Sequence, residues 1–133
     1  MIAKFRVGTA ERACMVDVTS QVRRAVRDGG VRSGVCTVYI PHTTAGVLVN
    51  EGADPAVAQD LVSHFDRAVP WGAAYQHVEG NSAAHIKAAV VGHTATVFVE
   101  NGDLALGTWQ GVYVWEHRSG SHRRQLALHV AGE

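Results

Sequence analysis

Alternating apolar and polar residues mark two strands near the start of the chain. In residues 3–7, alanine, phenylalanine and valine alternate with lysine and arginine. Residues 14–18 alternate in the same way, with Cys14, Val16 and Val18 on one face. Because successive side chains of a strand point to opposite faces, each stretch predicts a strand with one buried side.

Three later segments have the spacing and end signals of helices instead. The first follows Thr19 or Ser20, either of which can cap it, and ends at Gly29. The second begins at Asp54, a capping residue followed directly by proline. The third spans residues 82–92 and closes at a glycine. The apolar face of the first helix is formed by Val22, Ala25 and Val26, and that of the second helix by Val57, Leu61 and Phe65.

The remaining segments predict further strands and turns. We expect strands at residues 35–40, 46–50, 95–100, 111–115 and 125–130. The dipeptide Asn101-Gly102 is typical of a tight hairpin, and residues 67–80 are expected to be irregular. Helices interspersed with hairpin-linked strands predict a single compact α+β domain over residues 1–133, with a mostly antiparallel sheet and about three helices.

Composition narrows the class of protein. Hydrophobic residues make up 47% of the 133 residues, and twelve basic residues balance twelve acidic ones. A neutral chain lacks the overall attraction that drives binding to nucleic acid or to an anionic membrane. No apolar run reaches the ~20 residues of a membrane span, and the charged first residues are not typical of a signal peptide. Cys14 and Cys36 lack metal-type spacing, so we expect a cytoplasmic protein with reduced thiols.

Polar residues separate the strands predicted at 35–40 and 46–50. His42, Thr43 and Thr44 stand between two apolar runs, and the second run ends in Asn50 and Glu51. Threonine hydroxyls and exposed backbone N–H groups can bind a phosphate, and a histidine can bind a metal or transfer a proton near neutral pH. The alternative is that the threonines are ordinary turn residues and His42 is an ordinary surface residue.

A second polar cluster surrounds the start of the third predicted helix. His77 and His85 flank this start. The first N–H groups of a helix have no partners within the helix, so this position favours an anion. The candidate phosphate contacts are Gly80, Asn81 and Ser82. The alternative is that Asn81 or Ser82 only caps the helix.

A third cluster brackets the strand predicted at 111–115. Trp109 and Gln110 precede it, and Arg123 and Arg124 follow it after a short turn. A guanidinium group suits phosphate or carboxylate. Because adjacent strand residues point to opposite faces, at most one of the two arginines serves a given site. The sequence leaves open which of them it is, and we take Arg123 as the candidate. The alternative for the other is a solvated or interfacial charge, and for Trp109 a core or interface residue.

Three motifs together resemble one family. P-H-T-T-A-G at 41–46, E-G-N-S-x-x-H at 79–85 and G-T-W-Q at 107–110 occur in this order. They resemble the YjbQ-like family, also described as secondary thiamine-phosphate synthase enzymes, over roughly residues 5–132. The matching positions are His42, Thr43, Thr44, Asn50, Glu51, His77, Asn81, Ser82, His85, Trp109, Gln110 and Glu116. The segment 116–124 departs from the family pattern, because the family's first arginine and its proline have no match there.

The resemblance implies a compact α+β homotrimer with a weak ability to join a pyrimidine diphosphate to a thiazole phosphate, which gives thiamine phosphate. On this hypothesis the chain is a small-molecule enzyme acting on a phosphate ester. Its catalytic residues are His42, His77, His85 and Glu51. Its substrate-binding residues are Thr43, Thr44, Gly80, Asn81, Ser82, Gln110 and Arg123. The alternative is a non-catalytic trimer that binds a metal or another small ligand.

The expected cofactor depends on the reaction. Three imidazoles favour zinc or a similar transition metal, so we expect His42, His77 and His85 to converge on one pocket and share an ion. A pyrophosphate leaving group favours magnesium instead, for which Glu51 and Glu79 are the nearest carboxylates.

Overall fold

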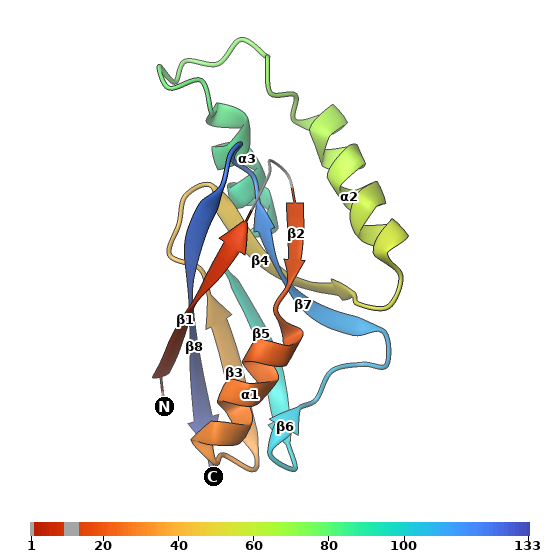
Figure 1. Ribbon diagram of the computed structural model, residues 1–133, viewed down its shortest axis with the longest axis vertical. Coiled ribbons are helices and arrows are strands. Elements are labelled where there is room, and N and C mark those ends of the chain that lie inside the picture. Colours follow the sequence, from red (N-terminus) through yellow and green to blue (C-terminus); the bar gives the residue numbers. More distant parts are fainter. Residues whose placement is uncertain (1, 10–13) are drawn as a thin grey trace.

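The computed structural model describes residues 2–9 and 14–133, which form two β-sheets and three helices (Figure 1). The strands are β1 (Ile2–Thr9), β2 (Cys14–Asp17), β3 (Gly34–Tyr39), β4 (Ala45–Glu51), β5 (Thr94–Glu100), β6 (Asp103–Leu104), β7 (Gln110–Glu116) and β8 (His122–Gly132). The helices are α1 (Thr19–Gly29), α2 (Pro55–Ala68) and α3 (Ser82–Val91). Each helix and strand predicted from the sequence is present, and β6 adds a short strand after the hairpin.

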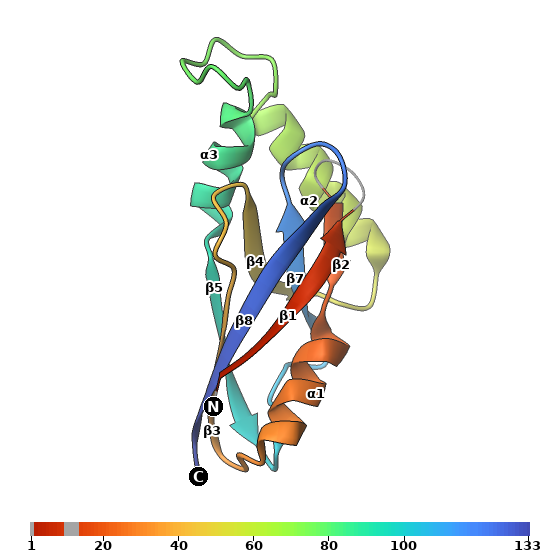
Figure 2. The same cartoon turned by 60° about the vertical axis from the view of Figure 1, so that its left-hand side comes forward.

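Every strand pair among the described residues is antiparallel. The larger sheet has the order β1–β8–β3–β5–β6, and the smaller one has the order β2–β7–β4 (Figure 2). The α+β prediction is therefore confirmed, although the strands divide into two sheets. Because β3 and β4 belong to different sheets, the chain has to cross between the sheets at residues 40–44.

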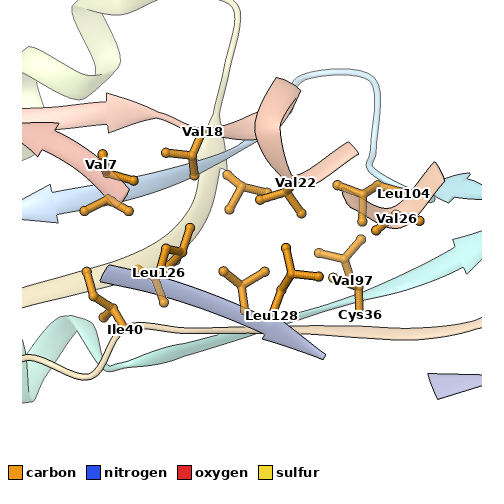
Figure 3. Packing of buried hydrophobic residues seen from close by; sticks show 14 of the residues in the cluster. Val7, Val18, Val22, Val26, Cys36, Ile40, Val97, Leu104, Leu126 and Leu128 are labelled. Atoms are coloured by element: carbon orange, nitrogen blue, oxygen red, sulfur yellow. The ribbon is translucent and has the colours of Figure 1, made fainter. Parts of the chain in front are cut away.

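A valine-rich core fills the space between the two sheets and α1 (Figure 3). Val22 and Val26 of α1 lie four residues apart and are fully buried, as is Leu126 of β8. Removing such a side chain from water contributes about 1.5–3 kcal/mol. Cys14 and Cys36 are both free, as predicted, and burial raises the pKa of the Cys36 thiol to about 11.

The polar interruption at residues 42–44 is the corner where the chain changes sheets. The N–H of Ile40 donates to the His93 carbonyl at 2.9 Å just after β3 ends. The Thr44 carbonyl accepts from the His117 N–H at 3.1 Å just before β4 begins. The backbone between these two bonds belongs to neither sheet, so the corner can present His42 and Thr43 at one end of the molecule.

Two of the predicted helix and turn signals are confirmed, and one is wrong. The carboxylate of Asp54 accepts from the Ala56 N–H at 3.0 Å and caps α2. Asn101 and Gly102 have φ angles of 53° and 78°, as a tight hairpin requires. Neither Thr19 nor Ser20 caps α1, because the helix begins one residue earlier than expected, after Val18. The Thr19 hydroxyl donates to the Asp17 carboxylate at 2.6 Å instead.

Helix α2 carries no buried residue. Its Phe65 ring makes a T-shaped contact with the Trp115 ring, with the ring centroids 5.2 Å apart. Asp66 accepts from the Lys87 ammonium of α3 at 2.5 Å. After α2, residues 69–81 form a loop that passes beyond the end of α3 before entering it (Figure 1). This loop is the irregular segment predicted from the sequence.

Candidate functional site

The corner 40–44, the loop 69–81 and the ends of β7 and β8 enclose a polar pocket of about 410 Å³. Its lining residues are Pro41, His42, Thr43, Thr44, His77, Glu79, Asn81, His85, Arg118 and Arg124. We call it the His42 pocket. It brings together the three histidines of two sequence clusters, which lie up to 43 residues apart in the chain.

His77 and His85 form a close pair on one wall of this pocket. Their ring centroids are 5.2 Å apart, and the ring planes are perpendicular. His77 belongs to the loop and is exposed, whereas His85 belongs to the first turns of α3 and is half-buried. Two imidazoles in this arrangement present nitrogen donors and acceptors to the same space.

His42 is held in one tautomer by β8. The backbone N–H of Gln125 donates to Nε2 of His42 at 2.9 Å. Nε2 is therefore the acceptor, and the hydrogen of the neutral ring lies on Nδ1. Burial, followed by the neighbouring Arg124 charge, lowers the pKa of His42. The Glu116 charge raises this pKa, but by less, so the pKa stays below its usual value. His42 is thus a neutral ring that can donate from Nδ1.

A buried ion pair forms the base of the pocket. The Arg124 guanidinium bonds both carboxylate oxygens of Glu116, through Nε at 2.8 Å and through Nη2. It also donates to the Thr44 hydroxyl at 2.9 Å, and Thr9 donates to Glu116 at 2.7 Å. Burial by itself raises the pKa of Glu116, but the bonds from Arg124, Thr9 and the Arg118 N–H outweigh burial and hold it below its usual value.

The arginine at the site is Arg124, and the expectation of Arg123 is wrong. Arg124 is 6% exposed and lines the His42 pocket, whereas Arg123 is exposed on the opposite face of β8. The residues of β8 alternate, and the inward positions begin at Arg124 because Leu126 and Leu128 face the core. Sequence reasoning also missed Arg118, an exposed residue whose side chain reaches the pocket from the turn after β7.

The start of α3 is only partly as expected. Asn81 occupies the capping position without making a capping bond, and it is 6% exposed. Its Oδ1 is buried and has no hydrogen-bond partner among the described residues. The N–H of Gly80 already donates to the His77 carbonyl at 3.2 Å, and Ser82 lines a neighbouring cavity instead. Of these three candidates, Asn81 is the one that lines the His42 pocket.

Glu51 and Gln110 lie away from the His42 pocket. They pair with each other at one end of the β4–β7 ladder, while Ala45 and Glu116 pair at the pocket end. Six residues of strand separate the two ends, which corresponds to about 20 Å. The Glu51 carboxylate accepts from the Ala53 N–H at 2.9 Å, and the Gln110 side chain accepts from the Gly107 N–H at 2.9 Å. The expectation that they join the histidines is therefore wrong within one chain, and Glu79 is the exposed carboxylate at the pocket.

The donors of the pocket do not fit the expected three-histidine metal site in this arrangement. No group of three or more His, Cys, Asp or Glu side chains in residues 2–9 and 14–133 is placed to hold an ion. Nε2 of His42 already accepts from Gln125, and the Nδ1 hydrogen blocks the other nitrogen. His77 and His85 remain as two nitrogen donors. Binding of zinc or magnesium stays a prediction.

Fold and pocket together define the class: a small α+β protein with a polar pocket lined by histidines and arginines. The chain belongs to the UPF0047 YjbQ-like family, whose family model matches residues 3–133. The family expected from the three motifs is thus confirmed. In the part of the chain that the structure describes, no helix is long and apolar enough to cross a membrane.

Relatives and solved structures agree with this assignment. The UPF0047 protein YugU of Bacillus subtilis (strain 168) is 44% identical over 117 residues, covering 87% of this chain and 89% of the relative. The UPF0047 protein MJ1081 of Methanocaldococcus jannaschii is 37% identical over 133 residues, covering 100% and 96%. The crystal structure of a YjbQ/UPF0047 family protein from Clostridium acetobutylicum has a TM-score of 0.93 at 40% identity, covering 97% and 99%. A hypothetical protein from Aeropyrum pernix K1 has a TM-score of 0.94 at 34% identity, covering 100% and 99%.

Proposed function

We propose that the chain is an enzyme that binds a phosphate ester in the His42 pocket and transfers protons through His77 and His85. The observation that carries this proposal is the convergence of the histidine pair with His42, Thr43 and two arginines around one polar pocket. Cationic and donor groups that converge from several elements favour a ligand with several anionic oxygens.

Each group at the pocket has a separate role in this proposal. Nδ1–H of His42 and the Thr43 hydroxyl donate to the phosphate oxygens. Arg118 supplies the positive charge, because this residue is exposed whereas the guanidinium of Arg124 is bound to Glu116. His77 and His85 line the same pocket and act as general acid and base, since an imidazole ring has both a donor and an acceptor nitrogen.

The candidate reaction is thiamine phosphate formation, in which a pyrimidine diphosphate joins a thiazole phosphate and pyrophosphate leaves. Both reactants carry phosphate groups that suit the donors of the pocket. Magnesium bound to pyrophosphate needs oxygen ligands, and Glu79 is the pocket carboxylate that is not engaged by Arg124. Glu79 would hold the ion, which would neutralise charge on the leaving group.

Turnover tests the proposal. We expect the chain to release pyrophosphate from the two precursors, and His85→Ala to lower the rate by about 10²–10⁴-fold, the usual contribution of general acid–base catalysis. His129→Ala is the matched control, because His129 is exposed on β8 and is not among the pocket residues. The melting temperature of both variants should stay close to that of the wild type.

Two further variants separate phosphate binding from chemistry. His42→Gln keeps an acceptor near the Nε2 position but has no donor at Nδ1, so we expect it to fold and to bind phosphate more weakly. His42→Asn keeps the donor position and loses the acceptor for Gln125. Binding of phosphate esters without turnover would favour the non-catalytic ligand-binding alternative. If calorimetry detects no binding of phosphate esters, both the enzyme hypothesis and the ligand-binding hypothesis are contradicted.

We also propose that the chain assembles as a homotrimer, as the family resemblance implies. Apolar side chains on the outer face of the larger sheet support assembly, because Phe98 is 65% exposed and Tyr39 is 46% exposed. Exposed aromatic residues on a sheet face are typical of an interface. Light scattering at micromolar protein should return three times the 14.2 kDa chain mass. A monomer mass would contradict the trimer.

A further inference from the structure

A cavity of about 480 Å³ lies at the end of the molecule that is remote from the His42 pocket. The last turn of α1, the segment after it and the turn between β5 and β6 form its walls (Figure 1). Strand β3 runs from this end to the corner 40–44, and its six residues correspond to about 20 Å. The cavity is therefore separate from the His42 pocket, and we call it the Arg32 cavity.

The backbone of Arg32 is fixed on both sides. Its N–H donates to the backbone oxygen of Glu133 at 2.8 Å, and its carbonyl accepts from the Gly102 N–H at 3.0 Å. Its guanidinium lies over Gly102, because a Cβ added at this glycine would come within 3.3 Å of Nη1 of Arg32. The turn residue thus leaves room for the guanidinium at the wall of the cavity.

Positive charge exceeds negative charge around this cavity. Asp103 is the one carboxylate among the described residues that line it. Both of its oxygens are engaged, Oδ1 by Arg23 at 2.9 Å and Oδ2 by Arg27 at 2.8 Å. The neighbouring acidic residues Asp28, Glu100 and Glu133 are exposed and do not line the cavity.

Two donors of the cavity are not used by the chain. Arg32 makes no ion pair with a described residue, and the Asn101 carboxamide makes no hydrogen bond with one. They come from the two opposite walls, Arg32 from the segment after α1 and Asn101 from the hairpin turn. The Arg27 guanidinium adds further N–H groups, because a guanidinium has five and Asp103 engages part of them.

We propose that the Arg32 cavity binds a doubly charged tetrahedral oxyanion, a phosphate group, through Arg32, Arg27 and Asn101. A tetrahedral anion presents oxygens in several directions and can accept from all three side chains, whereas a planar carboxylate suits one guanidinium fork. The bound anion would tie the end of α1 to the β5–β6 turn. This site is independent of the proposed function, since it shares no residue with the His42 pocket.

Titrations followed by ¹H–¹⁵N NMR distinguish the two ends of the molecule. The amide of Gly102 reports on the Arg32 cavity, and that of Gly80 reports on the His42 pocket. The probes are inorganic phosphate, methyl phosphate and acetate at about pH 8, with ionic strength held constant by sodium chloride. We expect inorganic phosphate to shift the Gly102 signal with saturation, and acetate to leave it unchanged. Methyl phosphate tells whether the site accepts an ester as well as the free ion.

Three variants locate the anion. Arg32→Met should weaken phosphate binding, as reported by Gly102, by about tenfold, the loss of one hydrogen bond to a charged group. Arg24→Met is the matched control, because Arg24 is exposed on α1 and does not line the cavity, and it should leave this affinity unchanged. Asn101→Gly suits the φ angle of 53° and removes the carboxamide, so it should weaken binding by about two- to tenfold. Melting temperatures verify that the variants fold.

The outcomes at the two reporters are independent. A Gly102 shift that rises in proportion to phosphate without saturation would overturn the inference, and so would an equal response to acetate. Equal losses in Arg32→Met and Arg24→Met would also overturn it, because net charge rather than the cavity would then attract the anion. A saturable shift of Gly80 alone would support the phosphate site of the proposed function and overturn the inference. A saturable shift of Gly102 alone would do the reverse.

Discussion

Replacing Arg124 with methionine should lower the free energy of unfolding by about 3–5 kcal/mol, the range for breaking a buried ion pair from one side. Arg124 and Glu116 are almost completely buried, with side-chain exposures of 8% and 0%. Without the guanidinium, the Glu116 carboxylate keeps the Thr9 hydroxyl and the Arg118 N–H as donors but has no compensating charge. Chemical denaturation at pH 7 measures the loss.

Two control variants make this prediction specific. Arg123→Met changes the neighbouring residue of the same strand, which is exposed, and should alter stability by less than about 0.5 kcal/mol. The double variant Glu116→Leu with Arg124→Met removes both charges, and should recover much of the loss, because two apolar side chains no longer leave an unpaired ion. A loss below about 1 kcal/mol for Arg124→Met would show that the pair does not stabilise the fold as its burial suggests.

Lowering the pH from about 6.5 to about 3 should destabilise the protein through His117. Burial, followed by the nearby Lys87 charge, lowers the pKa of this histidine from 6.5 to about 3, with Glu116, Arg124 and Asp66 also acting on it. The folded ring is therefore neutral, while the unfolded ring takes up a proton below pH 6.5. Stability is complete above that pH and falls by about 1.4 kcal/mol per pH unit below it, roughly 3–5 kcal/mol in total.

The window between pH 6.5 and 5 isolates the histidine contribution, because ordinary carboxylates still remain charged there. His117 is fully buried beside Trp115, and neither ring nitrogen has a hydrogen-bond partner among the described residues. His117→Leu should remove most of the slope of unfolding free energy against pH in this window. His42 also has a lowered pKa, so His42→Gln is the comparison, and it should remove a smaller part. If His117→Leu leaves the slope of unfolding free energy against pH unchanged, the pH dependence does not come from His117 and the prediction is wrong.

The strands and helices were predictable because local patterns determine them. Alternation marks β1 and β2, and Asp54 followed by proline marks the start of α2 with its capping bond. The convergence of His42 with His77 and His85 was expected from the motifs, but their geometry was not. The bond from Gln125 to His42 joins positions 83 residues apart, and no local pattern reports such a contact.

The predictions that were wrong concern residues whose position depends on how distant strands pair. Arg123 and Arg124 follow a turn, and only the pairing of β8 with its neighbours sets which of them faces inward. Glu51 was grouped with the histidines because it is close to His42 in sequence, yet β4 carries it to the opposite end of the sheet. His117 gave no signal, since β7 and the residue after it are buried on both faces and therefore do not alternate.

The His42 pocket is built partly from the buried network and partly from the loop 69–81, which has a consequence for how the pocket can vary among relatives. Arg124 and Thr44 belong to the buried network, so substitutions there change the pocket only at the expense of folding. His77, Glu79 and Tyr75 belong to the loop 69–81, which lies outside the buried core. We therefore expect relatives with this fold to differ chiefly in the loop residues of the His42 pocket, while the buried base of the pocket stays as it is.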